Sequence, residues 1–170
     1  MDKLLQKRLF DDFPKIFIEK DLPMQQTCMC WGICTDDGWF ELLHNLCSYL
    51  QWHTDRNKFP QVIAQQVKEK FGTLRFYYML DNPLTTDKKE NDQAIRRCAE
   101  HDGAIQFAES MSGRICEVCG AFDNTVELML RGGWYKTLCT VCAEPLDYKP
   151  IKPKDPIENL VTVKVPISED

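Results

Sequence analysis

The chain has few of the features that mark the less common classes of protein. Its 170 residues include only 8 glycines and 9 prolines, too few for a collagen-like or low-complexity chain. Its uninterrupted apolar runs are a few residues long, whereas a membrane-spanning helix needs about 20 apolar residues. The amino-terminal stretch MDKLLQKRLFDDFPK lacks the apolar core of roughly 7–15 residues that a secretory signal carries. From the sequence we therefore expect a soluble, cytoplasmic protein without membrane contacts.

Sequence motifs of catalysis are missing as well. The chain has no G-x-G-x-x-G or G-x-x-x-x-G-K-S/T loop, no H-E-x-x-H and no G-x-S-x-G. A zinc-braced His-Asn-His nuclease is disfavoured despite the dipeptide His44-Asn45, because no histidine lies between the cysteine pairs near the carboxyl terminus. Asp81 with Asp87-Lys88-Lys89 has a faint likeness to a metal-dependent nuclease centre but falls in a polar stretch. We therefore expect a binding protein rather than an enzyme.

The charge of the chain is acidic and unevenly distributed. Lys and Arg number 21 against 26 Asp and Glu, a formal charge of −5, which suits a nucleic-acid-binding protein poorly. One basic stretch, residues 51–80, has aromatic residues between its cations, a combination that single-strand binding proteins use. A solvated helix face would show the same charges and is the favoured interpretation. The residues that the alternative assigns to a nucleic-acid or partner surface are Arg56, Lys58, Lys68, Lys70 and Arg75.

Nine cysteines are the strongest compositional signal. Their odd number, the length of the chain and the missing signal peptide argue against a disulfide framework. Four of them form two C-x2-C pairs separated by 19 residues, a spacing typical of structural zinc sites. Four thiolates complete the tetrahedron of one zinc ion and leave no position for a catalytic water. The expected ligands of this single structural zinc are Cys116, Cys119, Cys139 and Cys142.

The residues around these pairs predict a zinc ribbon. Gly120 follows the first pair and permits a sharp backbone turn. Gly132-Gly133 separates two short strand patterns, 125–130 and 134–138, as in a two-residue hairpin. A thioredoxin-like redox pair is the rival interpretation of a single C-x-x-C motif, but no βαβ pattern surrounds either pair.

The amino-terminal cysteines leave two interpretations open. A second metal site could combine Cys28, Cys30 and Cys34 with His44 and Cys47. However, C-x-C-x3-C is not an established ligand spacing, and buried free cysteines are common. Packing in the core is therefore the favoured interpretation.

Hydrophobic periodicity predicts an α+β body with three main helices and a short sheet. The helices are expected at 39–52, 60–71 and 91–111, and a strand at 73–80. Shorter features are expected to be helical pieces within 1–20, an extended segment at 25–34 with Met29 and Trp31 on one face, and a polar loop at 81–92. Asp36-Asp37 is expected to supply a helix cap and a turn.

These elements divide the chain into a mainly helical body (1–112), a zinc ribbon (113–145) and a tail (146–170). Regularly spaced prolines predict an extended backbone in the first part of the tail. The alternating stretch VTVKVPI at 161–167 predicts a strand. We expect this strand to dock on a sheet of the same chain or of a second copy, because an exposed strand favours aggregation.

Five segments resemble a group of small, uncharacterised zinc-ribbon proteins of bacteriophages and prophages. These segments are TCMCWG (27–32), DGW (37–39), QVKEKFGTLRFYY (66–78), ESMSGRICEVCG (109–120) and GWYKTLCTVCAE (133–144). The resemblance is spread over most of residues 27–144 and implies a phage or prophage setting in the cytoplasm of a bacterial host. It implies no activity, and it does not extend to the tail.

Two classes of function agree with these observations. The favoured class is a phage accessory protein that binds a host or phage protein and inhibits or modulates a host enzyme or defence system. The alternative is a nucleic-acid-binding zinc-ribbon module in transcription or replication control. Residues 114–150 carry four basic and five acidic side chains, so phosphate contacts by the ribbon itself are disfavoured. The oligomeric state does not follow from the sequence.

Overall fold

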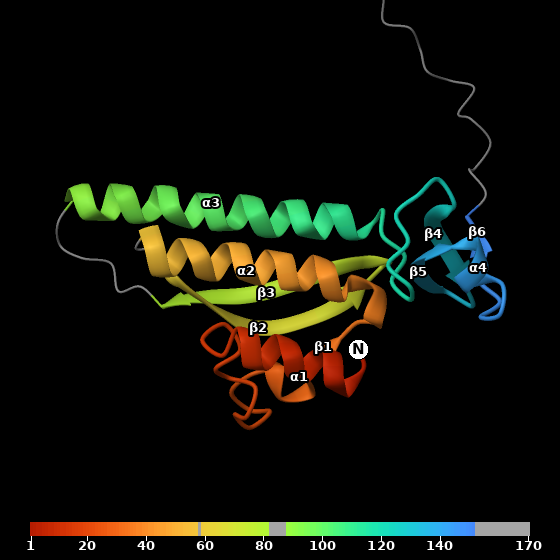
Figure 1. Ribbon diagram of the computed structural model, residues 1–170, viewed down its shortest axis with the longest axis horizontal. Coiled ribbons are helices and arrows are strands. Elements are labelled where there is room, and N and C mark those ends of the chain that lie inside the picture. Colours follow the sequence, from red (N-terminus) through yellow and green to blue (C-terminus); the bar gives the residue numbers. More distant parts are fainter. Residues whose placement is uncertain (58, 82–87, 152–170) are drawn as a thin grey trace, which may run out of the picture.

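The computed structural model in Figure 1 describes residues 1–57, 59–81 and 88–151, without the side chains of 88–91, 93 and 94. The chain forms a body followed by a smaller carboxyl-terminal part, which we call the four-cysteine module (residues 113–151). The elements, with η for a 3-10 helix, are α1 (Lys3–Asp12), η1 (Met29–Trp31), β1 (Ile33–Cys34), η2 (Asp37–Trp39), α2 (Phe40–Asn57), β2 (Gln61–Lys70), β3 (Thr73–Asp81), α3 (Lys88–Ser112), β4 (Val126–Arg131), β5 (Trp134–Cys139), α4 (Thr140–Ala143) and β6 (Lys149–Pro150).

The body is a three-stranded sheet with two long helices packed on one face. The strand order is β1-β2-β3, with β1 parallel and β3 antiparallel to β2. Figure 1 shows α2 and α3 side by side along this sheet, with α1 on the side of α2 that is away from α3. Val67 and Phe76 face the helices and are buried, whereas Tyr77 and Met79 are exposed on the other face of β3. The sheet therefore keeps one face in the core and one face open.

The structure confirms a mixed helix and sheet fold and most of the strongly periodic elements. α2 matches the helix predicted at 39–52 except at residue 39, α3 contains the helix predicted at 91–111, and β3 covers the strand predicted at 73–80. The loop predicted at 81–92 is wrong at both ends, because Asp81 belongs to β3 and α3 already begins at Lys88. β4 and β5 form the predicted hairpin, which turns at Gly132 and Gly133 with φ of 55° and 90°. Two central residues with positive φ give the turn that best matches the twist of a two-residue hairpin.

The helix predicted at 60–71 is wrong, because residues 61–70 form the strand β2. The buried side chains of β2 are Val62, Ala64 and Val67. The pairing with β3 shifts register between Ala64 and Gln66, which marks a β-bulge. One extra residue changes the spacing of buried side chains from two to three and so imitates a helical period. Pairing with β1 and β3, which lie elsewhere in the chain, makes this segment a strand.

The segment predicted to be extended at 25–34 is mostly turns. Only its last two residues form a strand, β1, and η1 precedes them. Met29 is fully buried while Trp31 is 63% exposed, so the two side chains do not share a face as strand alternation would require. Within 1–20, the predicted helical pieces correspond to α1, followed by turns from Pro14 onward.

The predicted tail is described only in its first residues. Lys149 and Pro150 form β6, which pairs antiparallel with β4. The predicted strand at 161–167, Pro153, Pro156 and residues 82–87 of the predicted loop lie outside the described residues. Among the helices of the described residues, none combines the length and the apolar character that crossing a bilayer requires.

Candidate metal centre

Four cysteine thiols converge in the four-cysteine module. The Sγ atoms of Cys116, Cys119, Cys139 and Cys142 all lie within 4.8 Å of one another, and those of Cys119 and Cys139 are 3.7 Å apart. All four cysteines are free, and their burial ranges from complete at Cys116 to exposed at Cys119. This arrangement could hold a metal ion, as the two C-x2-C pairs predicted.

Local backbone geometry places each of the two C-x2-C pairs at the four-cysteine cluster. In the turn after α3, the Gly120 N–H donates to the Cys116 carbonyl at 2.8 Å, and Gly120 has φ of 78°, a conformation that favours glycine. The β4–β5 hairpin returns the chain to this turn, so Cys139 ends β5 and Cys142 follows within α4. The first pair therefore lies in a turn and the second pair at the junction of a strand and a short helix.

Backbone donors surround the most buried thiol. Burial acts to raise the pKa of the Cys116 thiol, but hydrogen bonds from the backbone of Cys119, Cys139 and Val118 hold this pKa below its usual value. For Cys119 and Cys142, burial and the neighbouring thiols raise the pKa instead. N–H groups directed at a sulfur stabilise its thiolate form, which is the form that binds metal.

The body supports the first cysteine pair directly. The Gly38 N–H donates to the Glu117 carbonyl at 2.7 Å, and the indole N–H of Trp39 donates to the Ile115 carbonyl at 2.9 Å. A Cβ placed on Gly38 would lie 2.2 Å from the Cys116 carbonyl oxygen. The segment DGW of the body and the turn CEVCG, far apart in the sequence, are therefore in close backbone contact.

A buried carboxylate joins the same two segments. The Glu117 side chain is 1% exposed and accepts hydrogen bonds from the Asp36 N–H at 3.1 Å and from Lys136 Nζ at 2.9 Å. Lys136 also contacts the Asp36 carboxylate at 2.6 Å. Burial raises the pKa of Glu117, and the Lys136 ammonium opposes this shift. This triad holds the cysteine turn, β5 and the start of η2 together.

Sequence reasoning missed this triad. Asp36 and Asp37 were expected to cap a helix, but the Asp36 side chain makes no capping hydrogen bond and pairs with Lys136 instead. Asp37 accepts a hydrogen bond from the Asp2 N–H at 2.6 Å. The only signal in the sequence was a glutamate inside a C-x2-C pair, and its partners lie 81 and 19 residues away.

The second metal site considered for the amino-terminal cysteines is not formed. Within the described residues, the four-cysteine group is the only cluster of three or more Cys, His, Asp or Glu side chains that could hold a metal ion. Cys47 is fully buried in the core, and burial raises the pKa of its thiol. Packing in the core, the favoured interpretation, is thus confirmed for Cys47 but wrong for Cys28 and Cys34, which are exposed. The thiols of Cys30 and Cys34 donate to nearby backbone carbonyls, and His44 contacts the Asp12 carboxylate at 3.0 Å.

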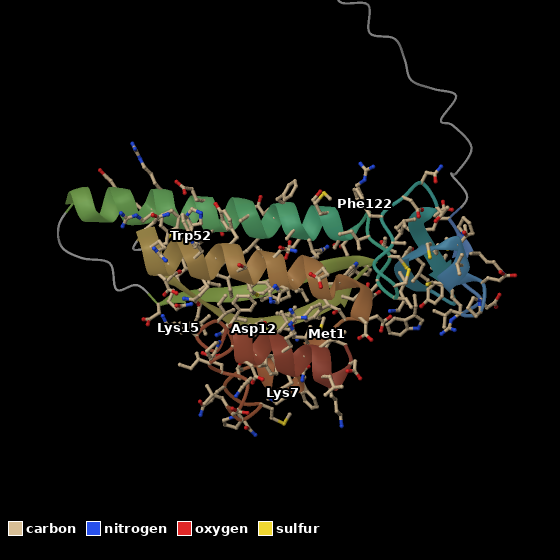
Figure 2. All side chains as sticks on the ribbon, viewed as in Figure 1. Met1, Lys7, Asp12, Lys15, Trp52 and Phe122 are labelled. Atoms are coloured by element: carbon tan, nitrogen blue, oxygen red, sulfur yellow. The ribbon has the colours of Figure 1, made fainter. Side chains whose placement is uncertain are left out.

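The predicted basic surface is divided between the two ends of β2. Arg56 lies in the last turn of α2, one turn beyond Trp52, which Figure 2 places away from the four-cysteine module. Lys68 and Lys70 lie at the far end of β2, and Arg75 is the register partner of Lys68 on β3. A strand rises about 3.3 Å per residue, so the seven steps from Gln61 to Lys68 along β2 separate the two ends by roughly 23 Å. Of the four predicted cations that the structure describes, three, Lys68, Lys70 and Arg75, therefore form one group.

Two residues named for candidate sites fall outside the described part of the chain. They are Lys58 of the basic surface and Asp87 of the nuclease-like pattern. Their assignments remain predictions.

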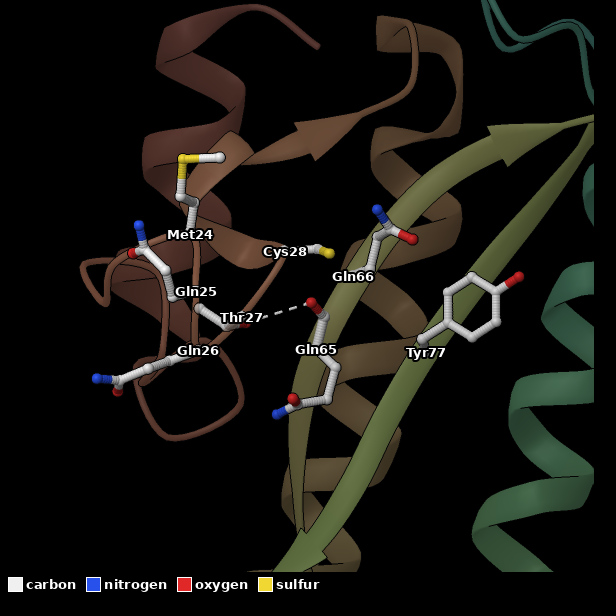
Figure 3. A pocket seen from close by; sticks show the side chains of 8 residues that line it. All are labelled: Met24, Gln25, Gln26, Thr27, Cys28, Gln65, Gln66 and Tyr77. Carbon is white, nitrogen blue, oxygen red and sulfur yellow. Dashed lines mark hydrogen bonds between the residues drawn. The ribbon is translucent and has the colours of Figure 1, made fainter.

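A polar hollow of about 350 Å³ lies where the loop at 24–28 meets β2 and β3 (Figure 3). The Thr27 hydroxyl donates to the Gln65 carbonyl at 3.3 Å, which ties this loop to the β-bulge. Its lining contains no charged side chain, and we assign it no chemistry. The lining residues are Met24, Gln25, Gln26, Thr27, Cys28, Gln65, Gln66 and Tyr77.

Comparisons of the chain with known protein families, with curated proteins and with solved structures find no match. The functional interpretation therefore depends on the geometry of the chain itself.

Proposed function

We propose that the four cysteines bind one structural zinc ion in a ribbon-like module. A zinc tetrahedron with bonds of about 2.3 Å has sulfur–sulfur edges of about 3.8 Å, which agrees with the 3.7 Å between Cys119 and Cys139. A set of four thiolates suits zinc or iron and disfavours magnesium or calcium. Because cysteines fill all four positions, the ion would stabilise the fold rather than activate water.

Elemental analysis of the full chain, purified under reducing conditions, tests the zinc proposal. We expect about one zinc per chain. Cys142→Ser should lower the zinc content well below one, whereas Cys28→Ser, at an exposed cysteine outside the cluster, should leave it unchanged. Iron in place of zinc, or equal zinc content in both variants, contradicts the proposal.

We propose further that the metal-bound chain is a phage or prophage accessory protein of the bacterial cytoplasm. It would act by binding a host or phage protein and thereby modulate a host enzyme or defence system. The phage setting rests on the sequence resemblance alone, whereas the observation that carries the protein-binding part of this proposal is an apolar hollow of about 390 Å³ between α2 and α3. Its lining consists of Leu42, Asn45, Leu46, Tyr49, Ala104, Phe107 and Ala108.

Phe107 is the main reason to treat this hollow as a binding surface. The residue is 67% exposed, and Tyr49 across the hollow is 42% exposed. Large apolar surfaces left open on a soluble domain mark interaction sites. A groove between two helices accepts the apolar face of an amphipathic helix. We therefore expect the partner to contribute such a helix, with apolar residues that enter the hollow.

Affinity capture from a bacterial lysate with the tagged full chain tests the protein-binding proposal. The matched variants are Phe107→Ser and Ile95→Ser, since Ile95 is 60% exposed on the same helix but does not line the hollow. We expect one protein to be retained by the wild type and by Ile95→Ser, with or without nuclease, and lost with Phe107→Ser. Equal capture by both variants, or loss of the protein after nuclease treatment, contradicts the proposal.

A further inference from the structure

Two hairpin turns meet at the junction between the body and the four-cysteine module. The β2–β3 turn consists of Phe71 and Gly72, and the Thr137 hydroxyl of β5 donates to the Gly72 carbonyl at 2.6 Å. A Cβ on Gly72 would lie 2.1 Å from the Leu128 side chain, so this turn rests directly on the β4–β5 hairpin. A hollow of about 370 Å³ lies between the turns, lined by Glu69, Lys70, Phe71, Gly132, Gly133, Trp134 and Tyr135.

Exposed aromatic rings surround this hollow. Phe71 is 64% and Trp134 is 73% exposed, and the Phe71 ring lies edge-on to Tyr135 with centroids 6.2 Å apart. Phe71 also has φ of 54°, a left-handed conformation that is unfavourable for a bulky residue. A glycine or asparagine would suit this turn better. Folding therefore does not explain an exposed aromatic residue at position 71, and strain of this kind is common at binding sites.

Three cations continue from the hollow along the open face of the body sheet. Lys70 Nζ lies 5.4 Å from the centroid of the Phe71 ring, and Lys68 Nζ lies 5.4 Å from that of Tyr77. Lys68 and Arg75 are direct partners across the strands, and like charges in this arrangement disfavour the sheet. Within the described residues, none of the three cations forms an ion pair with a carboxylate. These cations are available for an anionic ligand.

One acidic residue also lines the hollow. The Glu69 carboxylate accepts the Gly72 N–H at 2.5 Å, so it has a structural role in the turn. The Arg75 guanidinium is held by the Thr73 hydroxyl at 2.6 Å and the Leu74 carbonyl at 2.7 Å. Its position on the open face is therefore fixed in the absence of a ligand.

We propose that this face binds single-stranded nucleic acid. Bases stack on Phe71, Trp134 and Tyr77, and phosphates contact the three cations Lys68, Lys70 and Arg75. The carboxylates of an acidic protein could pair with the three cations but would not stack on the exposed rings. Every nucleobase, by contrast, has a flat face that stacks on an aromatic ring. The inference goes beyond the proposed protein-binding function and concerns a surface separate from the α2–α3 hollow.

Fluorescence anisotropy with labelled 12-nucleotide oligo-dT and oligo-U tests this proposal on the zinc-loaded full chain. Trp134→Ala should weaken binding about tenfold, the usual effect of removing one stacking ring. Phe71→Gly should weaken it similarly while the fold is kept, because glycine relieves the backbone at this position. Three phosphate contacts predict that the dissociation constant rises roughly 20-fold between 50 and 200 mM salt.

The control variant is Trp31→Ala, since Trp31 is 63% exposed and does not line the hollow. It should bind as the wild type does. Undetectable binding at 50 mM salt by the folded protein overturns the proposal. Polyglutamate that displaces the oligonucleotide equally well, together with unchanged binding by Trp134→Ala, also overturns it and assigns the face to acidic polymers. Neither outcome affects the capture experiment at Phe107.

Discussion

At the scale of single residues, the contact between the body and the cysteine turn leaves no room for a side chain at Gly38. A Cβ there would lie 2.2 Å from the Cys116 carbonyl oxygen and 2.4 Å from the Gly120 nitrogen. Both are backbone atoms of the turn that carries the first cysteine pair. They cannot move aside without displacing the thiol of Cys116, so this glycine is required by packing rather than by its own dihedral angles.

We predict that Gly38→Ala lowers the free energy of unfolding by about 2 kcal/mol or more, because overpacking against backbone forces the segments apart. Gly103→Ala is the control, since a Cβ at Gly103 in α3 meets nothing within 4 Å. Alanine is the better helix former, so this variant should gain about 0.5–1 kcal/mol. Urea denaturation followed by circular dichroism measures both changes. A Gly38→Ala protein as stable as Gly103→Ala would show that the contact is not tight.

His101 is a second residue whose surroundings determine its behaviour. Its side chain is fully buried, and neither ring nitrogen has a hydrogen-bond partner among the described residues. Burial, with a further contribution from the charge of His53, lowers the pKa of His101 to about 4, and the Asp102 carboxylate opposes this shift. The Phe59 ring packs 5.0 Å away. His101 is therefore neutral in the folded protein at ordinary pH.

We predict that His101 makes stability decrease as the pH falls from about 6.5 to about 4. The unfolded chain takes up the proton near pH 6.5, whereas the folded chain resists it until about pH 4. Each pH unit in this window costs about 1.4 kcal/mol. Between pH 7.5 and 5.0, the wild type should lose about 2 kcal/mol more than His101→Phe in urea denaturation. Protonation of the four cysteines affects both proteins equally and cancels in the comparison, so equal losses of stability would contradict the assignment.

At the scale of elements, α3 covers the free edge of β3. The Leu74 N–H donates to Ser112 Oγ and the Phe76 N–H to Glu109 Oε1, each at 2.8 Å. An uncovered strand edge tends to pair with other chains. Two side chains of α3 occupy this edge where the body meets the four-cysteine module, which also fixes the helix along the strand.

We predict that Ser112→Ala lowers the free energy of unfolding by about 1–3 kcal/mol, because it leaves the buried Leu74 N–H without an acceptor. Ser110→Ala on the same helix is the matched control, since Ser110 is exposed. Its effect should stay within about 0.5 kcal/mol. Thermal and urea denaturation of both variants measure the difference. Similar stabilities would mean that water or another group satisfies the Leu74 N–H.

At the scale of the whole molecule, the four-cysteine module and the body are coupled through contacts at the first cysteine pair. The contacts come from both sides of the cysteine turn: Trp39 bonds to the Ile115 carbonyl, and Glu117 bonds to the Asp36 N–H. The hydrogen bonds that fix the turn of the first cysteine pair are therefore the same bonds that attach the four-cysteine module to the body. An ion that binds only the folded four-cysteine cluster would also stabilise the segments of the body that pack against this cluster.

We predict that removing the metal with a chelator loosens part of the body as well as the module. Amide hydrogen exchange should accelerate at 116–143, where the pairs lose their common centre, and also at 36–39, which pack on the first pair. Amides at 62–64, in the part of β2 away from the module, should keep their protection and serve as the internal control. Unchanged exchange at 36–39 would show that the body does not depend on the metal centre.

Elements whose signals are local could be predicted from the sequence. The four cysteines carry their own spacing, the Gly132-Gly133 turn defines its hairpin, and α2 and α3 are long enough for helical periodicity to be clear. In each case the residues that determine the structure lie within a few positions of one another. The mixed helix and sheet fold and the candidate metal ligands followed from these signals alone.

Features that depend on distant contacts were decided only by the tertiary structure. β2 has a bulge that imitates helical spacing, and its pairing with β1 and β3 makes it a strand. Glu117 meets Lys136 and Asp36 across the junction of the two parts. The basic stretch is continuous in sequence, yet β2 places Lys68 and Lys70 roughly 23 Å or more from the end of the strand near Arg56. Periodicity reports which side chains are buried, but only the folded chain determines what they are buried against.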